Sequence, residues 1–92
     1  MNTADQPTNS VFDDLFANDQ DFVGAVRVAL QQDVELLEKF CQFVQEKIGQ
    51  ENVVNFGALA DALKIHACLD YLAIGVVSGK ISKEEILGMI KK

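Results

Sequence analysis

The residues best suited to chemistry are one histidine and two cysteines. His66 and Cys68 form a His-x-Cys pair, and Cys41 lies in a separate apolar segment. Structural zinc sites need about four ligands, usually in closely spaced pairs. Side chains two positions apart on a helix point about 200° away from each other. The sequence therefore predicts no metal, no cofactor and two buried, reduced thiols.

A cysteine nucleophile requires a nearby base and surroundings that favour the thiolate. Cys41 lies on an apolar stripe, which favours the thiol, and His66 points away from Cys68. His66 lies one helical turn before Asp70, whose carboxylate can orient the imidazole. We interpret this pair as a solvated surface contact, and we expect neither catalytic residues nor enzymatic activity.

Two further segments resemble binding motifs without meeting their requirements. Residues 75–80 end in Gly-Lys but are one residue short of a P-loop, and no strand precedes them. We interpret them as a helix end followed by a turn. Residues 55–65 resemble the first part of a helix-turn-helix, but no Lys or Arg follows before Lys80. DNA readout needs such side chains, so a DNA-binding regulator is kept only as an alternative.

The charge of the chain also argues against nucleic-acid binding. The 92 residues carry a formal net charge of −6, and residues 1–38 hold eight acidic side chains against one basic side chain, Arg27. Such a surface disfavours phosphate backbones and anionic membranes. Asp61, Lys64 and Asp70 interrupt the most apolar segment, so no run is long enough to cross a bilayer. Without a secretory signal at its start, the chain is expected to be cytoplasmic.

An acidic, aromatic segment spans residues 11–22. Hydrophobic anchors at helical spacing among carboxylates suit a groove rimmed by basic residues. We therefore predict contact with another protein that has a basic surface, through Phe12, Asp13, Asp14, Phe16, Asp19 and Asp21. The alternative is a short helix that closes the protein's own core.

Helical periodicity organises the rest of the chain. Residues 1–9 are polar and aperiodic and are predicted as a disordered tail, and residues 10–92 as a single helical domain. Ser10 is the expected cap of a short first helix. From residue 19 to 48 apolar side chains recur every three or four positions. One long helix is the simpler interpretation, and a break at Asp33, acting as a new N-cap, is the alternative.

Residues 53–78 are predicted as a helix with two opposed apolar faces. A helix that is apolar on both sides is buried on both sides. We therefore expect a homodimer, with one face covered by the chain itself and the other by a second copy. The interface is predicted at Ile65, Leu69, Leu72 and Val76. A monomer with this helix at its centre is the alternative.

The last helix has the clearest local pattern, because Ser82 and Glu85 form a capping box and Ile81 and Ile86 a hydrophobic staple. The fold class is therefore all-α: a small domain of four helices, two long and two short, packed antiparallel. We expect a small acidic, non-enzymatic interaction protein, such as a regulator, inhibitor or immunity-type factor, acting through its acidic N-terminal half. A small-ligand or metal binder is the remaining alternative.

Overall fold

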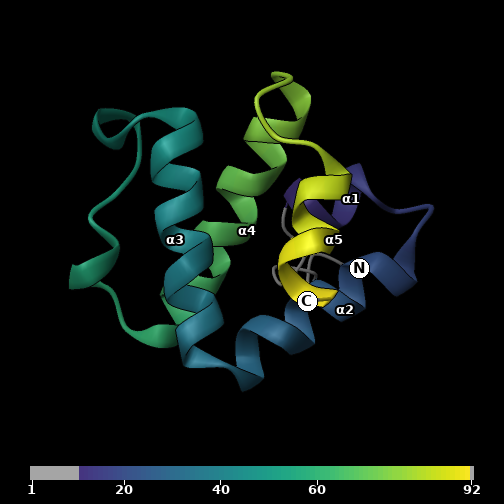
Figure 1. The fold of residues 1–92 in the computed structure, drawn as a ribbon, viewed down its shortest axis with the longest axis horizontal. Coiled ribbons are helices and arrows are strands. Elements are labelled where there is room, and N and C mark those ends of the chain that lie inside the picture. Colours follow the sequence, from purple (N-terminus) through teal and green to yellow (C-terminus); the bar gives the residue numbers. More distant parts are fainter. Residues whose placement is uncertain (1–10, 92) are drawn as a thin grey trace, which may run out of the picture.

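The structure, a computed structural model, describes residues 11–91. The predicted tail and the cap at Ser10 lie outside this range. The described residues form five α-helices and no strand (Figure 1), which confirms the all-α class. The helices are α1 (Val11–Leu15), α2 (Gln20–Gln32), α3 (Val34–Ile48), α4 (Asp61–Val77) and α5 (Lys83–Lys91).

A single residue, Asp33, separates α2 from α3. Its backbone is extended, with φ −133° and ψ 100°. Its carboxylate accepts a hydrogen bond of 3.1 Å from the backbone N–H of Leu36, and its own N–H donates to the carbonyl of Ala29. Because an aspartate carboxylate satisfies a free N–H at a helix start, the chain can end one helix and begin the next here. The break at Asp33 is confirmed, and one continuous helix over residues 19–48 is wrong.

The connection from residue 49 to residue 60 is not part of the predicted helix. Gly49 ends α3 with φ 107°, a conformation that glycine adopts at low cost. Two short 3₁₀-helices follow, Gln50–Asn52 and Phe56–Ala58. The helix predicted for residues 53–78 is therefore wrong over residues 53–60, and α4 begins only at Asp61.

Helices α3 and α4 lie side by side and run in the same direction (Figure 1). Glu38 on α3 pairs with Lys64 on α4, with a distance of 3.1 Å between Oε2 and Nζ. One turn further along both helices, Cys41 contacts Cys68. The connection 49–60 carries the chain back to the start of α4. This pair thus differs from the antiparallel neighbours expected from the sequence.

The core lies between the helices, and every helix contributes to it. Its largest fully buried side chains are Phe12, Val26, Leu30, Leu37, Phe40, Val44, Cys68, Leu69, Leu72 and Ile86. Burying one such apolar side chain contributes about 1.5–3 kcal/mol relative to leaving it exposed. A helix as short as α1 is unstable in isolation, so the burial of Phe12 helps to hold it in place.

The turn between α4 and α5 packs closely against Gly75. A Cβ atom at this position would lie 2.3 Å from Cδ1 of the buried Ile81. The Gly75 carbonyl also accepts hydrogen bonds from the N–H groups of Lys80 (2.8 Å) and Ile81 (3.1 Å). Gly79, with φ 81°, completes the helix end as the sequence predicts.

The capping box that opens α5 is confirmed. The Glu85 N–H donates to the Ser82 hydroxyl at 3.1 Å, and the Ser82 N–H donates to the Glu85 carboxylate at 2.9 Å. Lys47 of α3 also pairs with Glu85 at 3.0 Å. The hydrogen bond from Ser82, followed by that from Lys47, lowers the pKa of Glu85 below its ordinary value. The start of α5 is thereby tied to α3.

The substitution Gly75→Ala is expected to lower the free energy of unfolding by about 1–3 kcal/mol, because the new methyl group must displace Ile81. The matched control is Gly24→Ala within α2, where an added Cβ meets nothing within 4 Å. Better helix propensity should raise the stability of this control by up to about 1 kcal/mol. Urea denaturation of both variants measures the difference, and shifts of equal sign would contradict the close approach at Gly75.

Candidate interaction site

An apolar groove lies along the solvent side of α4. Its volume is about 430 Å³, and it is lined by Val54, Leu59, Leu63, His66, Ala67, Asp70, Tyr71 and Ile74. Leu63 is 58% exposed and Ile74 is 48% exposed. Three residues beyond Ile74, Val77 is 70% exposed. Apolar side chains gathered on one face in this way are typical of an interaction surface.

The second wall of the groove is the connection 49–60, which Tyr71 fastens to α4. The Tyr71 hydroxyl accepts a hydrogen bond of 3.1 Å from the backbone N–H of Val54. The rings of Phe56 and Tyr71 meet edge to face, with centroids 5.9 Å apart and an interplanar angle of 79°. Phe56 is itself buried in the core. These contacts hold Val54 beside α4.

His66 and Asp70 bring charge to this groove. Nε2 of His66 lies 3.6 Å from Oδ2 of Asp70, and both side chains are accessible to solvent. The other lining residues are apolar except for the Tyr71 hydroxyl. A partner would thus meet apolar surface with one imidazole and one carboxylate within it.

The four residues predicted for a dimer interface lie on the opposite side of α4. Leu69 and Leu72 are fully buried in the chain's own core, and Ile65 and Val76 pack partly buried against it. Leu69 and Leu72 thus have no exposed surface to offer a second copy, whereas a contact through Ile65 and Val76 stays a prediction. The sequence predicts two apolar faces on this helix. In the structure one of them packs into the core and the other is exposed to solvent.

Phe12 and Phe16 in the predicted N-terminal contact belong to an aromatic cluster. The ring of Phe12 lies 5.1 Å from that of Phe16 and 5.8 Å from that of Phe22, measured between centroids. Phe12 is fully buried, and Phe16 is half-buried against the core. The assignment of Phe12 as an anchor for a partner is therefore corrected, since the alternative interpretation, a short helix closing the core, describes its position.

Asp13 is engaged within the chain. Its carboxylate accepts two hydrogen bonds from Arg27, from Nε at 3.2 Å and from Nη2 at 2.5 Å. This two-point contact joins α1 to α2. A hollow of about 460 Å³ lies beside it, with Asp13, Asp14 and Arg27 among its lining residues. Asp14 is exposed there.

Asp19 is engaged as well, because it caps α2. Its carboxylate accepts a hydrogen bond of 3.2 Å from the Phe22 N–H and forms an ion pair with Lys83 of α5. The hydrogen bond from Lys83, and then that from Phe22, lowers the pKa of Asp19 below its ordinary value. Asp21, two positions on, is exposed. Among the six predicted residues, Phe12 is buried and Asp13 and Asp19 are paired within the chain, while contact with a partner through Asp14 and Asp21 stays a prediction.

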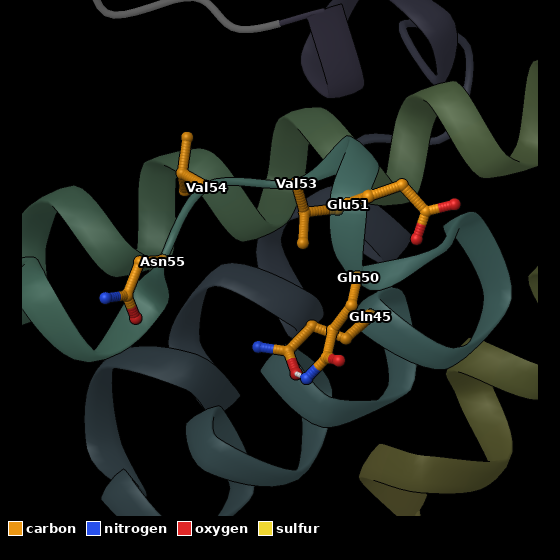
Figure 2. A pocket seen from close by; sticks show the side chains of 6 residues that line it. All are labelled: Gln45, Gln50, Glu51, Val53, Val54 and Asn55. Carbon is orange, nitrogen blue, oxygen red and sulfur yellow. Dashed lines mark hydrogen bonds between the residues drawn. The ribbon is translucent and has the colours of Figure 1, made fainter.

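A more polar hollow of about 450 Å³ lies where α3 meets the connection 49–60 (Figure 2). Its lining residues are Gln45, Gln50, Glu51, Val53, Val54 and Asn55. Nε2 of Gln50 lies 3.5 Å from Oε1 of Gln45, so these two carboxamides face each other. The lining holds one carboxylate and neither a thiol nor an imidazole. It therefore lacks an acid–base pair of the kind that general catalysis uses.

No group of three or more His, Cys, Asp and Glu side chains within residues 11–91 could hold a metal ion. In the same range no helix is long and apolar enough to cross a membrane. Comparison of the chain with protein-family models, with curated protein sequences and with solved structures found no match. The case for a function therefore depends on the surfaces described above.

The substitution Asp19→Ala is expected to lower the urea midpoint of unfolding, because α2 loses its cap and α5 loses an ion pair. The control Asp21→Ala, in the first turn of the same helix, should change it little. Since the pKa of Asp19 is lower in the folded protein, its contribution is present above the unfolded pKa and is lost as the pH falls through the folded pKa. The difference between wild type and Asp19→Ala should therefore shrink below about pH 4. A difference that persists in acid would contradict the ion pair.

Proposed function

We propose that this protein is a small non-enzymatic interaction protein, of a regulatory or inhibitory kind, that works through the groove on α4. The observation that carries the proposal is the row Leu63, Ala67, Asp70, Ile74 and Val77 on the exposed side of the helix. Steps of four and three residues alternate along this row, which is the spacing that keeps one stripe facing a partner helix. The row is about 21 Å long at 1.5 Å per residue.

The charges in the groove favour a second copy of this chain as the partner. A two-fold axis brings the same surface of two copies together. In an antiparallel pair of α4 helices centred between Ala67 and Asp70, Leu63 of one copy lies opposite Ile74 of the other. This register also brings Asp70 of each copy beside His66 of the other. One interface would then contain two such pairs, in agreement with the homodimer expected from the sequence but on the other face of α4.

The acidic N-terminal surface is a second candidate contact, for a protein with a basic surface. It is favoured by the exposure of Asp14 and Asp21 and by the hollow beside Asp14. A dimer would present this surface twice, and two linked contacts bind more tightly than one. Lysine at Asp14 and Asp21 should weaken such binding and leave the dimer intact, which separates the two surfaces.

Light scattering coupled to size-exclusion chromatography tests the dimer. We expect wild type to approach twice the chain mass as its concentration rises, and Leu63→Ser or Ile74→Ser to weaken dimerisation about tenfold or more, as a loss of at least ~1.4 kcal/mol would. Val34→Ser is the matched control, because Val34 on α3 is also 58% exposed. A single-chain mass for wild type at every concentration, or equal weakening by all three variants, would overturn the groove as a self-contact.

A charge exchange tests the register of the two copies. His66→Asp places two carboxylates near each other in each copy and across the interface, so it should weaken dimerisation at low salt. Combining His66→Asp with Asp70→His restores one carboxylate and one imidazole and should recover part of the affinity. If the double variant dimerises no better than the single one, Asp70 and His66 do not meet across a two-fold axis.

A further inference from the structure

Cys41 and Cys68, distant in the sequence, meet inside the core. The two thiols lie close enough to shift each other's pKa. Cys41 is 2% exposed and Cys68 is 0% exposed, and both are free thiols. They are contributed by α3 and α4, which pack along each other. The proposed function uses neither of them.

The parallel course of α3 and α4 explains this meeting. Glu38 precedes Cys41 by three residues, and Lys64 precedes Cys68 by four, so each charged residue shares a helix face with its cysteine. The Glu38–Lys64 ion pair of 3.1 Å closes the helix interface one turn before the two sulfur atoms. The Lys64 side chain is itself only 12% exposed. The two thiols therefore lie behind a salt bridge that holds the helices in register.

The surroundings give the two sulfur atoms different roles. Contact with the Cys68 thiol lowers the pKa of the Cys41 thiol, although burial and the nearby Glu38 carboxylate oppose the shift and Lys64 adds a smaller lowering. The same contact and burial raise the pKa of the Cys68 thiol. Of the two thiols, Cys41 is therefore the one that loses its proton more readily. Thiol oxidation needs such a division, because the thiolate is the nucleophile.

We propose that Cys41 and Cys68 are a modification site, at which hydrogen peroxide converts the two thiols into an intrachain disulfide between α3 and α4. The Cys41 thiolate attacks one peroxide oxygen, the O–O bond breaks, and the leaving hydroxide takes a proton to become water. Cys41 is then a sulfenic acid. The Cys68 sulfur attacks the Cys41 sulfur, and the departing hydroxide takes the Cys68 proton. Two thiols and one peroxide give one disulfide and two waters.

Two physical conditions control this step. Peroxide must reach a sulfur that is 2% exposed, so the rate depends on transient opening of the α3–α4 interface. The two sulfur atoms must also approach from non-bonded contact to about 2.05 Å. Once formed, the bond closes a long loop that includes the connection 49–60 and restricts the unfolded chain. The oxidised protein should therefore unfold at a higher urea concentration than the reduced protein.

The test treats the full folded chain with hydrogen peroxide and follows it by intact mass and by peptide mapping without reductant. We expect the loss of two hydrogen atoms, one cross-linked peptide pair containing Cys41 and Cys68, and reversal by a dithiol. Cys68→Ser should leave Cys41 as a sulfenic acid that a dimedone probe traps. Cys41→Ser should leave Cys68 unlabelled, because its thiol keeps its proton.

Cys41→Ala and Cys68→Ala, checked for native circular dichroism, should each abolish the cross-link, which controls for any disturbance of the core by serine. Three results would overturn the proposal: oxygen added to both cysteines without a cross-link, a cross-link only between chains, or a cross-link that forms only after denaturation. Equal dimedone labelling of both single variants would overturn the assigned roles.

Discussion

The packing of α4 against the rest of the chain is the interaction on which the structure depends. α4 is the most apolar of the helices, and its inner side places Leu69 and Leu72 fully inside the core. A chain this small has limited surface with which to cover a helix that is apolar on two opposed sides. The other helices cover the inner side, and the connection 49–60 reaches only the flank at Tyr71. The row from Leu63 to Val77 on the outer side stays exposed because no other part of the described chain covers it.

Local signals in the sequence were sufficient for much of the fold. The all-α class, the capping box at Ser82 and Glu85 and the helix end at Gly79 depend on neighbouring residues only, and the structure has each of them. The break at Asp33 was harder, because the apolar stripe continues across it when both helices face one core. Periodicity also gives two opposed faces on α4 without saying which one meets the core. The predicted interface therefore included Leu69 and Leu72, which the core covers.

The site was less predictable because its contacts are distant in the sequence. Asp13 is paired with Arg27 fourteen residues on, and Asp19 with Lys83 sixty-four residues on. A count of acidic residues treats all of them as free surface charge. The cysteines present the same difficulty, since the spacings Glu38 to Cys41 and Lys64 to Cys68 become informative only when α3 and α4 are known to run in parallel. The sequence alone indicates two thiols in apolar segments, and only the topology shows that they are neighbours.

The junction at Asp33 has a consequence for how this chain can change in length. One residue serves both helices there, so an insertion or deletion would turn every following side chain of α3 by about 100° about the helix axis. That rotation would move Leu37, Phe40 and Val44 out of the core together. The connection 49–60 between α3 and α4 does not fix the rotation of a helix in this way, because its short turns can absorb extra residues. Insertions and deletions should therefore be tolerated in the connection 49–60 and not at Asp33.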